Sequence, residues 1–273
     1  MTAPLRTIRI CADDYGIAPG VNRAILDLLD AGHIDATSVM MLPKSLDADA
    51  VVALAAVKQR RPTISVGLHL TLTAPFRAMT TGQPFKPIKD TLVAALMRRH
   101  DRAVLDAEVR AQLAAFTERF GQPPDHVDGH QHVHLFPQVR DAVLAAIAEA
   151  APSATVRQCG RAGSWAARIA DRKGLVLDLL SIAFRRRAVR HGIATNTAFA
   201  GTYDFDADAD FGALFPRFLD SLPDGGLVMC HPGFVDAELQ RLDPLTGLRE
   251  REYAYFMAEA FPRTLADKNI VLA

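Results

Sequence analysis

Residues 7–32 read TIRICADDYGIAPGVNRAILDLLDAG, and this stretch decides the fold. It opens with a short run of β-branched and apolar residues, Thr7 to Ala12, which predicts a buried strand. An acidic turn follows, and apolar side chains then recur at helical spacing from Val21 to Ala31. Gly32 is typical of a helix C-terminus because glycine adopts a left-handed backbone without steric cost. The stretch is therefore a strand, a turn and a helix, the repeating unit of an α/β protein.

The same alternation continues along the chain. Further strands are predicted at residues 37–42, 63–68, 126–130, 154–157, 193–199, 227–230 and 269–272, with helices at 48–59, 106–120 and 139–150. A segment rich in Pro, Gly and Thr, Ala74 to Lys89, predicts a long loop, which in a compact domain is usually functional or mobile. Seven or eight such units predict a single distorted (β/α) barrel over residues 1–273, rather than an open doubly wound sheet.

The composition excludes several classes of protein. With 31 basic and 31 acidic residues the formal net charge is zero, which gives no overall attraction to nucleic acid or to an anionic membrane. Three cysteines without paired spacing fit a reducing compartment, and we interpret them as buried packing residues. The longest apolar stretch, residues 175–184, is interrupted by Asp178 and is too short to span a bilayer. We expect a cytoplasmic protein with no nucleic-acid partner and no membrane insertion.

Ionisable side chains follow the predicted strands at the points where these end. They are Asp13, Asp14, His69, Asp128, His130, Arg157 and His231. In a (β/α) barrel the carboxyl ends of the strands converge on one mouth, where the chemistry of such enzymes takes place. The sequence therefore predicts a polar site at this mouth.

Three histidines at alternate positions form the strongest signal. Residues 126–134 read HVDGHQHVH, so an extended chain would carry His126, Asp128, His130, His132 and His134 on one face. Several histidines are hard to accommodate in an apolar core without a partner, and neutral imidazole is a common ligand of divalent transition metals. We predict that at least one of them binds metal. His132 and His134 can alternatively line the substrate pocket or cap the next helix.

His69 and the Asp13–Asp14 pair complete the candidate site. Alternation places His69 on one face with Thr71 and Thr73, where it is either a half-buried strand residue or a ligand. Adjacent aspartates at a strand end point opposite ways, so that one can bind metal while the other acts as a base. An Asx turn with Gly16 is the alternative for that pair. One Asp with two His has the composition of an open catalytic metal site.

Four segments together resemble the motifs of the YdjC-like carbohydrate deacetylases, a family that includes chitooligosaccharide deacetylases and a hopanoid-biosynthesis-associated branch. The segments are residues 12–16 (ADDYG), 67–73 (GLHLTLT), 126–134 (HVDGHQHVH) and 228–234 (VMCHPGF). The resemblance runs from Ile8 to about Phe256 and is loose between Arg161 and Thr197. It implies a barrel related to the polysaccharide deacetylases and hydrolysis of an N-acetyl group on a sugar with one divalent metal ion. It also allows a homodimer.

The resemblance assigns roles by position. Asp14, His69 and His130 match the metal ligands of the family, and Asp13 matches its proposed base. His231 stands where related deacetylases hold a catalytic histidine. Tyr15 replaces a common Phe, which we expect to affect the wall of the substrate pocket.

An amide carbonyl is a poor electrophile and water is a poor nucleophile, so the expected reaction has to activate both. A divalent metal acidifies water and polarises the amide carbonyl, Asp13 takes the water proton, and His231 donates a proton to the leaving amine. His132 and Arg157 are predicted to bind the carbohydrate substrate, and Arg157 can alternatively orient Asp13 or form a structural ion pair. One carboxylate with two imidazoles suits Zn or Co, and a water-rich version tolerates Mg.

Two other functional hypotheses remain open from the sequence. Metal-dependent phosphoesterases and amidohydrolases also use His-x-His in barrels, although usually on the first strand, where this chain has Asp-Asp. A non-catalytic sugar-binding regulator would be expected to lack a ligand or the base, and this chain has both.

Overall fold

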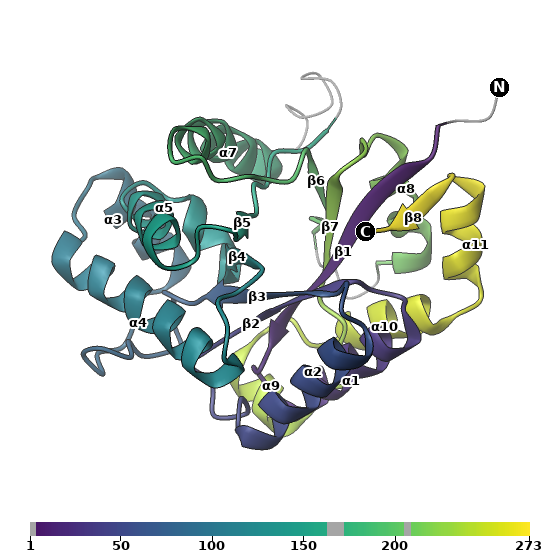
Figure 1. Cartoon of the computed structure of the whole chain (residues 1–273), viewed down its shortest axis with the longest axis horizontal. Helices are drawn as coiled ribbons and strands as arrows, with labels where there is room; N and C mark the ends of the chain where they lie inside the picture. Colours follow the sequence, from purple (N-terminus) through teal and green to yellow (C-terminus); the bar gives the residue numbers. More distant parts are fainter. Residues whose placement is uncertain (1–3, 163–171, 205–208) are drawn as a thin grey trace.

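The structure is a computed structural model that describes residues 4–162, 172–204 and 209–273. The long strand β1 (Arg6–Tyr15) runs through its centre, with both faces buried from Ile10 onward. This explains the apolar run of the sequence, because a central parallel strand is covered by helices or barrel core on both faces. Figure 1 shows the helices packed around the sheet and the C-terminus beside β1.

Within the described residues, every pair of named strands is parallel. The other strands are β2 (Ala36–Val39), β3 (Ser65–Leu70), β4 (His126–Gly129), β5 (Thr155–Val156), β6 (Phe199–Ala200), β7 (Gly226–Cys230) and β8 (Ile270–Leu272). Their order is β5-β4-β3-β2-β1-β7-β6, and β8 pairs with the beginning of β1. Parallel bridges from Val156 to Thr195 and from Arg161 to Phe199 link the two ends of this order. The sheet therefore curls into the predicted distorted (β/α) barrel.

Helices cover the outside of the sheet. They are α1 (Pro19–Ala31), α2 (Ala48–Arg60), α3 (Ile88–Leu96), α4 (Arg102–Phe120), α5 (Val139–Ala150), α7 (Arg172–Arg190), α8 (Phe211–Asp220), α9 (Ala237–Leu242), α10 (Arg249–Met257) and α11 (Ala260–Asp267). Helix α1 buries the predicted apolar stripe from Val21 to Leu29, and Gly32 ends it in a left-handed conformation with φ of 75°.

Several predicted boundaries are wrong: for example, β2 ends at Val39 and not at residue 42, and α4 begins at Arg102 and not at residue 106. The acidic turn after Ala12 is part of β1, with an irregular register between Ala12 and Tyr15, because the strand continues to pair with β2. The predicted strand at 193–199 contributes only its last residue to β6, since the preceding residues make isolated bridges. The loop after β3 covers residues 71–87 and not the predicted 74–89, because β3 ends at Leu70 and α3 begins at Ile88.

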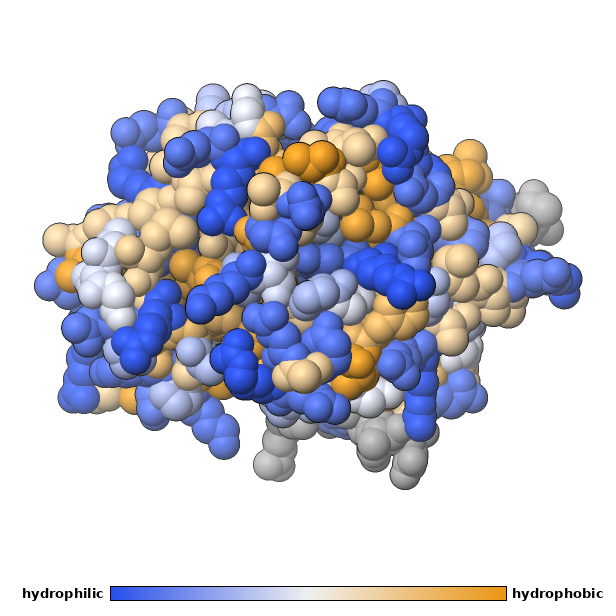
Figure 2. All heavy atoms as spheres, turned by 90° about the horizontal axis from the view of Figure 1, so that it is seen from below, coloured by the Kyte–Doolittle hydropathy of each residue, from blue (hydrophilic) through white to orange (hydrophobic). Residues whose placement is uncertain are grey.

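The surface carries no dominant apolar area on the face drawn in Figure 2, where hydrophilic side chains separate small apolar patches. The three cysteines are buried and free, as expected. Across the described ranges no helix combines the length and the apolar character needed to cross a bilayer.

Candidate metal and catalytic site

The polar residues at the strand ends do meet at one mouth. A cavity of about 460 Å³ lies there, lined by Asp13, Asp14, His69, Ile88, Gly129, His130, Gln131, His132, Met229, His231, Asp243 and Leu245. Most of the ionisable side chains predicted from the sequence are therefore around this single space, although they come from four different strand ends. This is the location expected for the active site of a (β/α) barrel.

Asp14, His69 and His130 present their ligand atoms to one another. Asp14 Oδ1 lies 3.0 Å from His130 Nδ1 and 3.3 Å from His69 Nε2. These atoms belong to one of three groups, among the described residues, whose geometry could hold a metal ion. In the group of Asp13, His69 and Asp128 both carboxylates are bound by Arg157. The predicted set thus fits a divalent cation best, with one carboxylate oxygen and two imidazoles.

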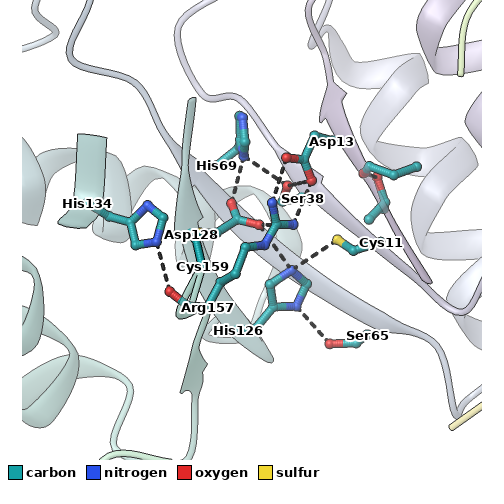
Figure 3. Close-up of polar contacts among 12 residues, drawn as sticks. Cys11, Asp13, Ser38, Ser65, His69, His126, Asp128, His134, Arg157 and Cys159 are labelled. Carbon is teal, nitrogen blue, oxygen red and sulfur yellow. Dashed lines mark hydrogen bonds and ion pairs between the residues drawn. The ribbon is translucent and has the colours of Figure 1, made fainter. Parts of the chain in front are cut away.

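The third group, Cys11, His126 and Asp128, lies deeper in the barrel. Gly67 makes room for the His126 ring, since a Cβ there would meet it at 2.3 Å. Burial lowers the pKa of His126 to about 4, so that the ring is neutral and bonds Ser65 Oγ at 2.8 Å. Figure 3 shows Cys11, Ser65 and His126 on the far side of Arg157 from His69. Because Arg157 also binds Asp128, a cation in this group would face a guanidinium.

Asp128 orients His69. Its Oδ1 accepts a hydrogen bond from His69 Nδ1 at 2.6 Å, which directs Nε2 of the same ring toward Asp14. A carboxylate behind a histidine in this way fixes the tautomer of a metal ligand. Burial lowers the pKa of His69, but the carboxylates of Asp128 and Asp13 outweigh this effect and raise it to about 10.

Arg157 binds Asp13 through a bidentate ion pair. Arg157 Nη1 and Nη2 donate to its two oxygens at 2.6 Å each, and Nη2 also lies 2.5 Å from Asp128 Oδ2 (Figure 3). Burial raises the pKa of Asp13, but the guanidinium more than offsets this and holds the pKa below its ordinary value. Asp13 is therefore an ionised carboxylate in a fixed orientation at the cavity wall.

Asp14 lines the same cavity as Asp13, although strict alternation would place adjacent strand residues on opposite faces. Its backbone is left-handed, with φ of 71°, which is uncommon for a residue other than glycine. Its second oxygen, Oδ2, accepts a hydrogen bond from Arg249 at 2.6 Å. Burial raises the pKa of Asp14, and Arg249 and His130 outweigh it, so that the pKa lies well below the ordinary value.

The extended face predicted for residues 126–134 is wrong. The strand ends at Gly129, and Gln131 and His132 both adopt positive φ, so the chain turns into a short 3-10 helix, His130–Leu135. His130 and His132 still line the cavity, whereas His134 Nε2 donates to the Arg157 carbonyl at 2.8 Å. Figure 3 shows His134 apart from the other side chains. The turn thus separates the histidines that sequence alternation had grouped.

Two predicted substrate contacts do not line this cavity. Tyr15 is fully buried, and its hydroxyl donates to the Ala50 carbonyl at 2.7 Å, so it supports α2 instead of the pocket wall. Arg157 is 2% exposed and lies behind Asp13, which favours the orienting alternative. His132 does line the cavity, where its Nδ1 lies 3.5 Å from Cys159 Sγ.

Sequence reasoning missed two residues of α10. Arg249 contacts Asp14, and Glu252 accepts hydrogen bonds from the His231 backbone N–H at 2.5 Å and the Tyr203 hydroxyl at 2.6 Å. Burial raises the pKa of Glu252, and the nearby His231 and the Tyr203 hydroxyl offset part of the rise. Both residues lie in a charged run, Arg249 to Glu252, yet each is only 1% exposed.

Comparison with known proteins identifies the family to which the chain belongs. A chitooligosaccharide deacetylase of Citrobacter koseri is 29% identical over 275 residues, covering 93% of this chain and 95% of the relative. One from Proteus mirabilis is 27% identical over 270 residues, covering 91% and 92%. A solved structure from Enterococcus faecalis V583, described as a candidate cellobiose-phosphate cleavage protein, has the same fold. Its TM-score is 0.73 at 20% identity, and the match covers 99% of this chain and 97% of that one. The model of the YdjC-like protein family matches residues 7–267, and the chain belongs to this family.

Proposed function

We propose that the chain is a divalent-metal-dependent hydrolase that removes the N-acetyl group from an amino sugar or an acetylated oligosaccharide. The observation that carries the proposal is the meeting of Asp14, His69 and His130 beside the ion-paired carboxylate of Asp13 in one cavity. The names of the relatives from Citrobacter koseri and Proteus mirabilis support the substrate class, since the match spans nearly their whole length.

Each residue has a role that its contacts support. A divalent cation held by Asp14, His69 and His130 would acidify water and polarise the amide carbonyl, which lets a carboxylate of lowered pKa serve as the base. Asp13 accepts the proton of the attacking water, and Arg157 holds its two oxygens in place. His231 lines the same cavity and donates a proton to the departing amine nitrogen. His132, whose imidazole lines the cavity, forms a hydrogen bond with the sugar.

The donor set suits Zn²⁺, and Mg²⁺ would be bound with more water ligands. Elemental analysis of the purified protein, followed by removal of the metal and its restoration with Zn²⁺ or Mg²⁺, distinguishes the two.

The test is acetate release from N-acetylated mono- and disaccharides, measured with wild type and with the Asp14→Ala and His130→Ala variants. We expect both variants to lose metal and activity. Full activity with unchanged metal content in both variants would refute the assignment. Phosphate release from sugar phosphates in place of acetate would favour the phosphoesterase alternative. Metal binding by wild type without turnover of any acetylated sugar would favour a binding protein.

A further inference from the structure

Arg249, the first residue of α10, contacts the candidate metal site through Asp14. It is 1% exposed, and its Nη2 donates to Asp14 Oδ2 and to Asp243 Oδ2 at 2.6 Å each. Its Nε donates to the Leu245 carbonyl at 2.9 Å. Three acceptors on two segments therefore fix the guanidinium, so that its position does not depend on a single ion pair.

These contacts give the two carboxylate oxygens of Asp14 different partners. Oδ2 is taken by Arg249, and Oδ1 is the oxygen that faces His69 Nε2 and His130 Nδ1. We infer that Arg249 is a positioning residue that limits Asp14 to one-oxygen ligation of the cation. The inference rests on the metal site of the proposed function. One-oxygen ligation leaves more coordination positions for water and for the substrate carbonyl, which an open catalytic site requires.

Arg249 also keeps a second carboxylate out of the ligand set. Asp243 lines the cavity, yet its Oδ2 is turned to Arg249 and its Oδ1 accepts the Leu245 N–H at 2.8 Å. Without the guanidinium, Asp14 and Asp243 would be two buried carboxylates with no cation between them, which is costly. The same arginine thus fixes both the orientation of the ligand carboxylate and the number of carboxylates at the site.

The experiment measures binding of Zn²⁺ itself to the full chain after metal removal. Calorimetry is applied to wild type, Arg249→Met, Arg249→Lys and Asp243→Asn, and crystals of each are soaked with Zn²⁺. As a control, Arg161→Met breaks another ion pair, that of the half-buried Arg161 with the buried Asp178 at 2.8 Å, whose members are not among the proposed ligands. Circular dichroism confirms that each variant is folded.

We expect Arg249→Met to weaken Zn²⁺ binding roughly tenfold to a hundredfold, the usual effect of removing a group that orients a ligand. The soaked crystals should show one oxygen of Asp14 on the ion in wild type, and both oxygens, or Asp243 as well, in Arg249→Met. Asp243→Asn keeps the contact of Arg249 with Asp14 and should stay within about threefold of wild type. Arg161→Met should bind Zn²⁺ as wild type does.

Wild-type affinity and ligation in Arg249→Met, or an equal loss in Arg161→Met, would overturn the inference. If Arg249→Met does not fold, Arg249→Lys decides, since lysine keeps the charge but has no counterpart of the Nε that donates to the Leu245 carbonyl and fixes the guanidinium. A wild type that binds Zn²⁺ but releases no acetate would refute the proposed reaction alone and leave this inference standing. A wild type that binds no divalent cation would refute the inference.

Discussion

Two neighbouring aspartates at the end of β1 have opposite surroundings. Asp13 is bound through both oxygens by Arg157, whereas Asp14 offers one oxygen to two imidazoles and the other to Arg249. Strict alternation would place adjacent strand residues on opposite faces, but the irregular register between Ala12 and Tyr15 and the left-handed backbone of Asp14 accompany two carboxylates that line one cavity. The proposed roles of base and ligand therefore depend on the different partners of the two carboxylates.

Asp13→Asn tests this division. The variant keeps the volume of the side chain but cannot accept a proton, so we expect kcat to fall by about 10² to 10⁴. Metal content should remain at the wild-type level, because Asp13 is not among the proposed ligands. Acetate release and elemental analysis are measured on the same preparation. Loss of metal from Asp13→Asn would show that the two aspartates do not have separate roles.

At the scale of elements, α4 holds the loop that follows β3. The buried carboxylate of Glu108 accepts hydrogen bonds from the Met79 and Thr80 N–H groups at 2.9 Å each and from the Thr80 hydroxyl at 2.8 Å. One turn later, Gln112 bonds both the N–H and the carbonyl of Thr71. Within the loop Phe76 packs edge-on against His130, with ring centroids 5.9 Å apart. Helix α4 therefore supports one wall of the site.

Glu108→Ala should release this loop. Four hydrogen bonds to Glu108 disappear and the Met79 and Thr80 N–H groups lose their acceptor, so we expect faster tryptic cleavage after the exposed Arg77. KM for the acetylated sugar should rise, while most of the fold persists. Limited proteolysis with mass spectrometry measures the cleavage. Glu118→Ala, an exposed position on the same helix, is the control, and equal cleavage in both variants would contradict the prediction.

At the scale of the whole molecule, the barrel interior contains histidines that burial keeps neutral. Burial lowers the pKa of His126 and His134 to about 4 each and that of His132 to about 3. In the unfolded chain these rings titrate near the ordinary value of about 6.5. Below that pH the unfolded state binds more protons, so the free energy of unfolding falls until the folded rings also protonate near pH 4 to 3.

The prediction is a loss of stability between about pH 6.5 and 4 in the metal-free protein, at up to about 1.4 kcal/mol per pH unit for each such histidine. Urea unfolding at a series of pH values measures it. His126→Gln removes one of the titrating rings and should flatten the curve by about one such contribution. A slope unchanged by this substitution would refute the linkage of acid stability to His126.

Much of the architecture and of the candidate site was accessible from the sequence. The alternation of apolar runs with helical periodicity predicted the parallel barrel, because these patterns depend only on which faces of local elements are buried. The motifs at the strand ends predicted that Asp13, Asp14, His69, His130 and His231 would share a mouth, and they line one cavity.

Only the tertiary structure decided how those side chains are held. The turn with positive φ at Gln131 and His132 broke the expected histidine face, and Arg249, Glu252 and Glu108 became site supports although nothing in their spacing marks them. The physical reason is that a pattern of polarity records which faces of an element are buried, whereas an ion pair between residues 14 and 249 exists only once the chain has closed on itself.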